Sequence, residues 1–392
     1  MDNGLFTLGD AVHAVAPVSF GTMVKPGGCT CNLACSYCYY LGTAGLYGGR
    51  QPVMGADLLE EYIRQYIEAN EADEVSFCWH GGEPLLLGVE FFRKALQLQR
   101  KYADGKTISN ALQTNGMRID EQWCRFFREN GFLIGLSLDG PEDIHNAYRM
   151  TKGGKPTFAT VMGAVRMLQR HGVEYNTLSV VNHLSEGRGA EIYRFFRDDV
   201  GSRYMQFLPA ANRRLPWAVS AQGYGRFLID VFDEWVKHDV GTSFVQIFDA
   251  TLAGWCGITP GVCYFNDVCC DSLTVEHNGD VYPCDHFVGP GYLLGNIREK
   301  TLGEMFGSKA RLDFSLSKRN SLPLDCLRCQ FYHVCHGECP EHRENGRNVL
   351  CEGLKAYFWH VAPAMDRMKE LLGEGRAPME IMNDDKLKMN RI

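Results

Sequence analysis

The chain has 392 residues, of which 45% are hydrophobic, a composition that suits one large or two medium globular domains. Its formal net charge of −7 argues against nucleic acid or an anionic membrane as a partner, because both favour basic surfaces. No run of about 18 apolar residues is present, and Met1-Asp2-Asn3-Gly4 lacks the basic start of a signal peptide, so we expect a cytoplasmic protein without a membrane span.

Short β-rich runs alternate with helical stretches from about Pro17 to Trp235. The candidate strands are Phe20–Val24, Val75–Trp79, Thr107–Gln113, Leu133–Leu138, Tyr175–Val181 and Tyr204–Leu208. The candidate helices lie near residues 56–69, 90–103, 120–130, 158–171, 188–199 and 220–237. Repeated βα units with short strands favour parallel pairing, and six of them indicate an α/β fold with a partial (β/α)6 TIM-like barrel. In such a barrel the chemistry collects at the carboxyl ends of the strands.

A loop after the first candidate strand carries Cys31, Cys35 and Cys38, a CxxxCxxC spacing. Three thiolates on one tight loop can hold three irons of a cubane cluster, which leaves the fourth iron without a protein ligand. An open metal position is typical of a catalytic site. A zinc loop or unrelated core cysteines are the alternatives, but zinc prefers paired CxxC units or mixtures of Cys and His, and no histidine is near. The spacing therefore favours an iron–sulfur cluster with one open iron.

The CxxxCxxC loop followed by tyrosine resembles the signature of the radical S-adenosylmethionine enzymes. The resemblance implies that the open iron chelates the amine and carboxylate of S-adenosylmethionine. It also implies that an electron from the reduced cluster cleaves the sulfonium and gives a 5′-deoxyadenosyl radical. The spacing alone indicates only the open site, and the radical chemistry comes from the family.

The second candidate strand is followed by His80-Gly81-Gly82-Glu83-Pro84, which by itself is an ordinary turn sequence. Two glycines there would let the backbone approach a ligand closely. Together with the cysteine loop, the segment resembles the family's GGEP motif, which binds the amino group of S-adenosylmethionine. The resemblance implies that Gly82 and Glu83 contact the cofactor.

The third and fourth candidate strands end in Gln113-Thr114-Asn115-Gly116 and Ser137-Leu138-Asp139-Gly140-Pro141. Both segments are also good turn formers. Polar side chains at strand ends would suit a ribose and a carboxylate. By resemblance, Ser137, Arg149 and Tyr37 are expected to contact S-adenosylmethionine.

Ten of the sixteen cysteines crowd residues 256–351, and eight of these form a dense pattern. The eight are Cys263, Cys269, Cys284, Cys326, Cys329, Cys335, Cys339 and Cys351. Since disulfides are rare in reducing cytosol, metal ligation is the better account of them. Eight thiolates could ligate two four-iron clusters, and a pair of all-thiolate zinc sites is the alternative. The open-site loop in the same chain favours iron, because a radical enzyme benefits from nearby redox centres.

This pattern resembles the SPASM extension of peptide-modifying radical enzymes and, more narrowly, the anaerobic sulfatase-maturating enzymes. The narrower resemblance covers nearly the whole chain, from the cysteine loop through GGEP, LQTNG, SLDGP and VYPCD to the cysteine-rich ending. It implies that Cys263, Cys269, Cys284 and Cys339 hold a first auxiliary cluster, and Cys326, Cys329, Cys335 and Cys351 a second. Cys29, Cys78, Cys124, Cys256 and Cys270 would be structural or incidental. The choice of Cys269 over its neighbour Cys270 rests on the resemblance alone.

Asp285 directly follows Cys284 and is either a turn aspartate that caps it or a general base. Removal of a β-hydrogen from a cysteine or serine leaves a carbon radical, which must lose a proton and an electron to become a thioaldehyde or an aldehyde. A carboxylate within hydrogen-bond reach could accept the proton, and a nearby cluster the electron. The resemblance favours the base. It also implies that Tyr40 and His80 lie at the substrate, although His80 stands where the family has glutamine and histidine titrates near neutrality.

The resemblance implies an enzyme that oxidises a cysteine or serine of a sulfatase to Cα-formylglycine, with S-adenosylmethionine and three four-iron clusters as cofactors. The expected partners are a sulfatase polypeptide with a Cys/Ser-x-Pro/Ala-x-Arg motif and a flavodoxin- or ferredoxin-type electron donor. Another peptide modifier, such as a thioether- or crosslink-forming enzyme, and a non-catalytic zinc or electron-transfer protein are the alternatives. Thioether formers usually carry an N-terminal recognition domain, whereas only about 30 residues precede Cys31.

We expect three segments along the chain: the partial barrel over residues 15–240, the auxiliary-cluster domain over 250–360, and a C-terminal helix and tail over 361–392. The helical stretch Leu354–Leu372 carries apolar residues at three- and four-residue spacing and is expected to pack back on the barrel. The stretch from Gly373 to Ile392 is polar and is expected to be peripheral.

Overall fold

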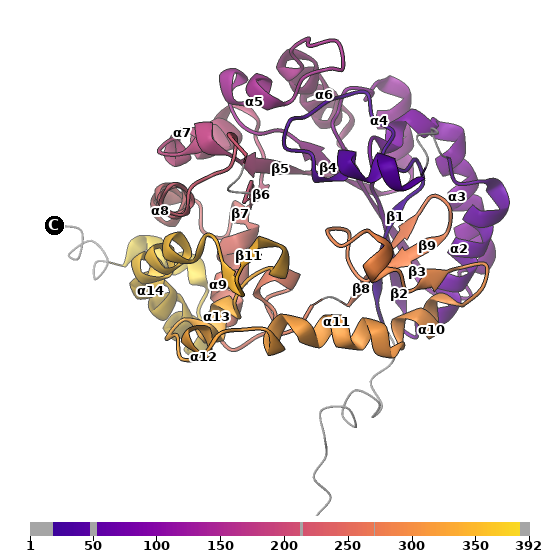
Figure 1. The fold of residues 1–392 in the computed structure, drawn as a ribbon. Helices are drawn as coiled ribbons and strands as arrows, with labels where there is room; N and C mark the ends of the chain where they lie inside the picture. Colours follow the sequence, from indigo (N-terminus) through magenta and orange to yellow (C-terminus); the bar gives the residue numbers. More distant parts are fainter. Residues whose placement is uncertain (1–18, 48–52, 212–214, 270, 385–392) are drawn as a thin grey trace, which may run out of the picture.

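The computed structural model of the protein describes residues 19–47, 53–211, 215–269 and 271–384. The predictions for residues 15–18, Cys270 and residues 385–392 lie outside this part of the chain. A curved ten-stranded sheet of order β10-β9-β8-β1-β2-β3-β4-β5-β6-β7 forms the centre, and the helices of the barrel lie on its outer side (Figure 1). This arrangement confirms the predicted α/β fold with a partial barrel.

The strands from β1 to β7 are each parallel to their neighbours. They are β1 (Gly21–Lys25), β2 (Glu74–Trp79), β3 (Thr107–Thr114), β4 (Phe132–Ser137), β5 (Tyr175–Val181), β6 (Tyr204–Pro209) and β7 (Phe244–Val245). Apolar side chains such as Phe77, Trp79 and Ile134 are fully buried against the helices, which fixes the register of each strand. The six predicted strands are all present, and β7 adds a seventh that is too short to show a periodicity in the sequence.

The helices that accompany these strands bury apolar residues toward the sheet, and two of them, α4 and α8, have a polar side chain as N-terminal cap. They are α2 (Ala56–Ala69), α3 (Val89–Tyr102), α4 (Glu121–Glu129), α5 (Glu142–Tyr148), α6 (Phe158–His171), α7 (Gly189–Arg194), η4 (Phe195–Asp199), α8 (Ala221–His238) and α9 (Gln246–Trp255). In α4, for example, the Asp120 side chain accepts a hydrogen bond from the backbone N–H of Trp123. In α6, Val161, Val165 and Leu168 are buried.

The second half of the chain extends the same sheet. Strand β8 (Ser272–Glu276) pairs in parallel with β1, and β9 (Asp280–Tyr282) and β10 (Gly295–Asn296) continue antiparallel. Between α9 and the last long helix the chain also forms η5 (Cys263–Phe265), η6 (Pro290–Tyr292), α10 (Leu302–Phe306), α11 (Lys309–Asn320), α12 (Leu324–Leu327), α13 (Tyr332–Cys335), η7 (Pro340–His342), β11 (Arg343–Glu344) and β12 (Arg347–Asn348). The cysteine-rich segment is therefore joined to the barrel by the pairing of its strand β8 with the barrel strand β1.

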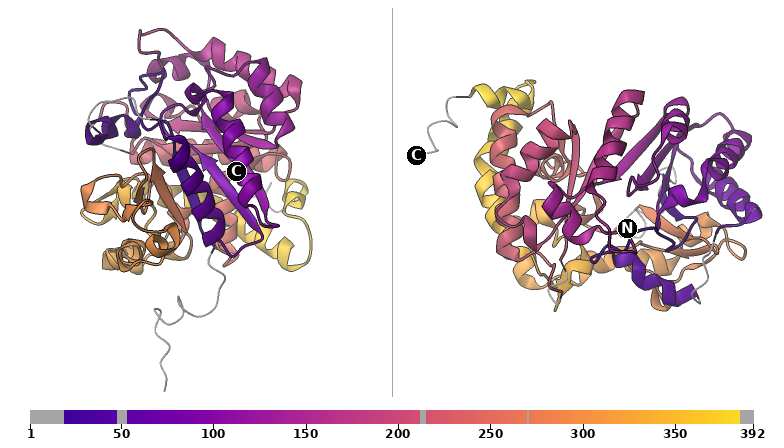
Figure 2. Two further views of the ribbon diagram at one scale, coloured as in Figure 1. Left: turned by 90° about the vertical axis from the view of Figure 1, so that its right-hand side faces the viewer. Right: turned by 90° about the horizontal axis from the view of Figure 1, so that it is seen from above.

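The last long helix, α14 (Cys351–Gly373), packs along α8 on the outside of the molecule (Figure 2). Two glycines make this contact close: a Cβ on Gly353 would lie 1.7 Å from the carbonyl oxygen of Ala221, and one on Gly225 would lie 2.5 Å from that of Gly353. Helix α14 spans residue 360, where the sequence predicted a segment boundary, and the segment limits stay a prediction. None of the helices in the described ranges is both long and apolar enough to cross a membrane.

Candidate active site at the carboxyl ends of the strands

The cysteine loop crosses the carboxyl ends of the strands and is held there by backbone hydrogen bonds. The N–H groups of Gly82 and Glu83 donate to the carbonyl oxygens of Gly28 and Thr30, each over 2.8 Å. On the other side, the N–H of Ala34 donates to the carbonyl of Met150 over 2.9 Å. The GGEP segment therefore clamps the cysteine loop, a role that the sequence did not suggest.

Gly82 leaves no room for a side chain. A Cβ at this position would lie 2.1 Å from the carbonyl oxygen of Thr30, and the obstructing atom belongs to the backbone. We expect Gly82→Ala to displace the loop, to lower the free energy of unfolding by about 1–3 kcal/mol and to reduce the iron bound after anaerobic reconstitution. Thermal unfolding and iron analysis measure both effects.

Gly42 supplies the matched control for this prediction. It lies in η1 (Tyr39–Tyr47), shortly after the same cysteines, and a Cβ there would meet nothing within 4 Å. Gly42→Ala should therefore bind iron like the unchanged protein. Equal iron binding by the Gly82→Ala variant would show that the close contact is dispensable.

The three loop cysteines lie close enough to affect one another's protonation. Burial raises the pKa of the Cys31 thiol to about 11, and the charges of Cys35 and Cys38 add to the rise. Burial also raises the pKa of Cys35, whereas the charge of Arg149 lowers it. The side-chain amide of Asn115 lies 3.6 Å from the Cys31 sulfur. Thiols with a raised pKa stay protonated in the absence of metal and release their protons when a metal binds. These three cysteines therefore suit the binding of a cluster.

Glu83 ties the end of β2 to the end of β3. Its buried carboxylate accepts hydrogen bonds from the backbone N–H groups of Leu85 and Asn115 and from the hydroxyl of Thr114, over 2.8–3.0 Å. Burial raises its pKa to about 6, although these hydrogen bonds oppose the rise. Glu83 therefore holds the ends of β2 and β3 together through its own hydrogen bonds. Its contact with the cofactor stays a prediction.

A buried ion pair organises the residues beside Cys35. Arg149 donates through Nε to Asp139 Oδ1 over 3.0 Å, and the hydroxyl of Tyr37 donates to the other oxygen of the same carboxylate. The Arg149 guanidinium lies 5.4 Å from the centre of the Tyr37 ring. Ser137 accepts from the side-chain amide of Gln113 over 3.1 Å. The predicted cofactor residues thus come from three segments: Tyr37 lies in the cysteine loop, Ser137 ends β4, and Arg149 directly follows α5.

Asp139 itself was not predicted as a site residue. The signal was present in the sequence: an aspartate directly after a buried strand, with an arginine ten residues later. A carboxylate buried at that position needs a cation nearby, so the pair could have been inferred. We assign it to holding Arg149 and Tyr37 in place.

Asp285 is linked to the end of the cysteine loop by a hydrogen bond from Tyr39. The Tyr39 hydroxyl donates to Asp285 Oδ2 over 2.6 Å, and the Tyr39 ring stacks on His286 with 4.7 Å between ring centres. Burial raises the pKa of Asp285, but the charges of His286 and Lys25 outweigh it and hold that pKa well below its ordinary value. Asp285 is therefore ionised at neutral pH, the state that a proton acceptor needs.

Tyr40 points elsewhere. Its ring is buried, and its hydroxyl donates to both carboxylate oxygens of Glu276, at 2.7 and 2.8 Å. Of the two adjacent tyrosines, Tyr39 is thus the one that touches Asp285. Sequence reasoning missed this because the direction of each side chain depends on local backbone angles that the motif does not reveal. The substrate role of Tyr40 stays a prediction.

His80 follows β2, and its Nδ1 accepts a hydrogen bond from the backbone N–H of Gly81 over 2.7 Å. Burial lowers the pKa of His80 to about 4, and the charge of Lys25 contributes. The imidazole is therefore neutral from about pH 5 upward, so its charge matches that of the glutamine that the resemblance leads us to expect here.

We expect His80→Gln to keep the rate within about threefold of the unchanged protein, because a glutamine oxygen can accept the same hydrogen bond without a change of charge. The pH dependence of the rate between about pH 5.5 and 8 should be the same for both proteins. His80→Leu, which has no acceptor, is the control. A step near the ordinary histidine pKa that disappears in His80→Gln would contradict the neutral assignment.

Three cysteines of the first predicted auxiliary group lie together. Burial raises the pKa of Cys339 well above its ordinary value, and the charges of Cys263 and Cys269 add to this. The fourth, Cys284, lies next to Asp285, with 3.7 Å between its sulfur and Asp285 Oδ1. Its place in the first group rests on the resemblance.

The second group is more sharply defined. Its four cysteines, Cys326, Cys329, Cys335 and Cys351, line one cavity. Burial raises the pKa of Cys335 to about 12, and the charges of Cys351 and Cys329 contribute.

The cysteine groups fit iron–sulfur clusters, in which each thiolate binds a different iron. In the part of the chain that the structure describes, no three His, Cys, Asp or Glu side chains converge on a single ion. Cys31, Cys35 and Cys38 would hold an open-site cluster, and the two later groups would hold fully ligated ones. Which cysteines ligate stays a prediction.

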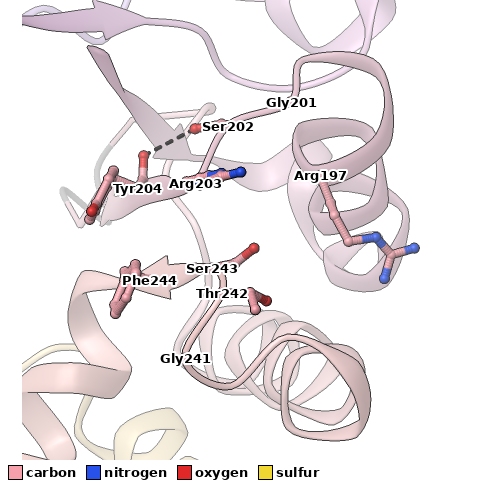
Figure 3. A pocket seen from close by; sticks show the side chains of 9 residues that line it. All are labelled: Arg197, Gly201, Ser202, Arg203, Tyr204, Gly241, Thr242, Ser243 and Phe244. Carbon is pink, nitrogen blue, oxygen red and sulfur yellow. Dashed lines mark hydrogen bonds between the residues drawn. The ribbon is translucent and has the colours of Figure 1, made fainter. Parts of the chain in front are cut away.

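A separate cavity of about 480 Å³ lies at the amino ends of β6 and β7, opposite the strand ends described so far (Figure 3). The rings of Tyr204 and Phe244 stack at its wall with 5.1 Å between centres. Arg197, Arg203 and Thr242 also line it. None of the predicted site residues lines this cavity, so we exclude it from the candidate active site.

Family models match two parts of the chain: the radical SAM superfamily over residues 26–196 and the SPASM iron–sulfur cluster-binding domain over residues 263–330. The chain is 45% identical over 388 residues to a serine-type anaerobic sulfatase-maturating enzyme of Bacteroides thetaiotaomicron, which covers 92% of this chain and 94% of that protein. A serine-type enzyme of Klebsiella pneumoniae is 39% identical, with 93% of both chains covered. A cysteine-type enzyme of Clostridium novyi is 34% identical, covering 87% of this chain and 94% of that protein.

Solved structures agree with these relatives. Native anSMEcpe with bound AdoMet superposes with a TM-score of 0.81 at 30% identity, covering 90% of this chain and all of that one. The same enzyme with AdoMet and the Cp18Cys peptide gives the same TM-score. Streptococcus suis SuiB bound to its precursor peptide SuiA matches at 16% identity with a TM-score of 0.60, which shows a shared fold alone.

Proposed function

This chain belongs to the anaerobic sulfatase-maturating enzymes, and from that membership we propose that it oxidises a serine or cysteine of a sulfatase polypeptide to Cα-formylglycine. It is a radical S-adenosylmethionine oxidoreductase that carries a SPASM iron–sulfur domain. One observation supports Asp285 as the proton acceptor of this reaction: the hydrogen bond from Tyr39 to Asp285 joins the residue after Cys38 to the residue after Cys284. A base at residue 285 therefore lies close to the loop that carries Cys38 and to the segment that carries Cys284.

The reaction removes one hydrogen atom and one electron from the β-carbon and one proton from the hydroxyl or thiol of the substrate residue. A serine gives the aldehyde directly, whereas a cysteine gives a thioaldehyde, which water hydrolyses to the aldehyde with release of hydrogen sulfide. When bound, S-adenosylmethionine and the open-site cluster supply the one-electron chemistry that takes the hydrogen atom. The Asp285 carboxylate accepts the proton, and the Tyr39 hydroxyl fixes the orientation of that carboxylate. The Arg149–Asp139 pair and Tyr37 hold the Cys35 side of the loop in place.

The partner is a sulfatase polypeptide, as the names of the relatives and the peptide-bound structures of anSMEcpe support. We propose that the modified residue lies in a Cys/Ser-x-Pro/Ala-x-Arg motif, whose arginine suits an enzyme with a net charge of −7. A flavodoxin- or ferredoxin-type protein would supply the electron, and the reaction would take place in the cytoplasm.

We propose serine as the preferred residue, because the serine-type relatives are 39–45% identical to this chain and the cysteine-type ones 32–34%. Anaerobic incubation with two peptides that differ only in serine or cysteine, followed by mass spectrometry, tests both substrate and preference. The serine peptide should lose two hydrogens and gain an aldehyde that reacts with a hydrazine probe. Cleavage of S-adenosylmethionine with no modification of either peptide would refute the proposed formation of formylglycine.

Two alternatives from the sequence are addressed by the same preparation. A peptide crosslinker would join residues and leave no aldehyde. A zinc or electron-transfer protein would contain zinc, or iron without cleavage of S-adenosylmethionine, on metal and sulfide analysis.

A further inference from the structure

Two lysines, Lys25 and Lys318, have no exposed surface, and no other lysine in the described ranges is buried. Lysine is rarely buried unless an anion compensates its charge. Neither residue was predicted as functional. Each lies beside cysteines of the first predicted auxiliary group, which we call the first auxiliary set: Cys263, Cys269, Cys284 and Cys339.

Lys25 ends β1 and lies beneath the two tyrosines of the cysteine loop. Its ammonium is 3.8 Å from the centre of the Tyr40 ring and 5.5 Å from that of Tyr39. Among the described residues its Nζ has no hydrogen-bond partner. Burial lowers the pKa of Lys25, while four anionic groups oppose that shift: Asp285, Glu276, Cys284 and Cys38. Because the Lys25 ammonium makes no hydrogen bond and lies among anionic groups, it influences its surroundings through its charge.

Lys318 lies on α11 and contacts the backbone beside Cys263 of the first auxiliary set. Its Nζ donates to the carbonyl oxygens of Cys263 and Tyr264 over 2.7 and 2.9 Å. Burial lowers the pKa of Lys318, and the charges of Cys269, Cys263 and Cys339 are among those that oppose the shift. Lys318 therefore faces the three cysteines of the set that Lys25 does not.

Together the two lysines reach the whole set. Lys25 contacts the ring of Tyr39, whose hydroxyl donates to Asp285 beside Cys284, and it also lies near Cys38 of the cysteine loop. Lys318 donates to the carbonyl of Cys263 and lies near Cys269 and Cys339. A four-iron cluster gains one negative charge when it is reduced. A buried positive charge stabilises the reduced form more than the oxidised form, and it does so strongly where water is excluded.

We propose that Lys25 and Lys318 raise the reduction potential of the cluster held by the first auxiliary set, which makes that cluster the acceptor of the substrate's electron. The inference rests on the proposed function. In that step the substrate carbon radical gives one electron to the cluster and its hydroxyl gives one proton to Asp285, while the C–O bond becomes a carbonyl. In this role the lysines act through the cluster, as positioning residues.

A redox titration of the reconstituted holoenzyme without peptide, followed by electron paramagnetic resonance, tests the proposal. Signals that change on addition of S-adenosylmethionine report the open-site cluster, and the remaining signals report the auxiliary clusters. Lys25→Met and Lys318→Met remove the charges while keeping an unbranched side chain. Lys25→Arg keeps the charge, and Lys309→Met removes an exposed lysine from the same helix, α11, as Lys318.

In both methionine variants we expect the midpoint potential of the same auxiliary cluster to become more negative by ~59 mV. This shift corresponds to about a tenfold lower ratio of reduced to oxidised cluster at the original midpoint. Lys25→Arg and Lys309→Met should leave that potential unchanged. Unchanged auxiliary potentials in Lys25→Met, or shifts of different clusters in the two variants, would overturn the proposal. Because the titration needs no peptide, its failure is distinct from failure to form formylglycine.

Discussion

Replacement of Cys35 with alanine is expected to abolish cleavage of S-adenosylmethionine. Three thiolates are needed to hold three irons of the open-site cluster, and Cys35 is the central one of the loop. The variant should retain the auxiliary clusters, so its iron content should fall from about twelve to about eight atoms per chain. Anaerobic iron analysis and chromatography of 5′-deoxyadenosine measure the two effects.

Cys256 provides the matched control for this experiment. It follows α9, is half-buried and belongs to none of the cysteine groups. Cys256→Ala should keep both the iron content and the cleavage rate. Cleavage at the normal rate by the Cys35→Ala variant would exclude the loop as the site of the open cluster.

Asp285→Asn should separate the two halves of the reaction. Cleavage of S-adenosylmethionine should continue, because Asp285 is not among the expected ligands of the open-site cluster. Formation of formylglycine should fall by about 10²- to 10⁴-fold, the usual contribution of a positioned base. Asparagine has nearly the same shape and can still accept the hydrogen bond from Tyr39, but it cannot take a proton at neutral pH. Both products are measured in one anaerobic assay by mass spectrometry.

Tyr39→Phe complements this variant, since it keeps the carboxylate and removes the hydroxyl that orients it. We expect a smaller loss of formylglycine than in Asp285→Asn and unchanged iron content. Undiminished product from Asp285→Asn would remove Asp285 from the role of base. A loss of iron in the same variant would show that the effect is structural.

The barrel was largely predictable from the sequence because its elements have strong local signals. Helix Phe158–His171 has a buried stripe of Val161, Val165 and Leu168 and ends at Gly172, which adopts a left-handed conformation with φ 62°. Strand Tyr175–Val181 follows directly and was predicted with the same bounds. Periodicity and end signals of this kind depend on neighbours in sequence, so no tertiary information was needed.

The contacts around Asp285 were not predictable, because they join distant segments. Tyr39 and Asp285 are 246 residues apart, and the sequence offered no reason to prefer Tyr39 over Tyr40. Lys25 was overlooked because lysine is ordinarily exposed, and only the packing of both tyrosines over it shows its burial. The motif residues were found by pattern, whereas their supporting residues became visible only in three dimensions.

The pairing of β8 with β1 has a consequence for how the protein can be dissected. All five residues of β1 are in register with β8, from Gly21 opposite Ser272 to Lys25 opposite Glu276. A fragment ending near residue 250 would expose that whole margin of β1 as a row of unsatisfied amides and carbonyls, which invites intermolecular sheet growth. The first half of the chain is therefore unsuited to expression as an isolated domain. Because β8 continues its sheet beyond β1, the two halves are expected to unfold together.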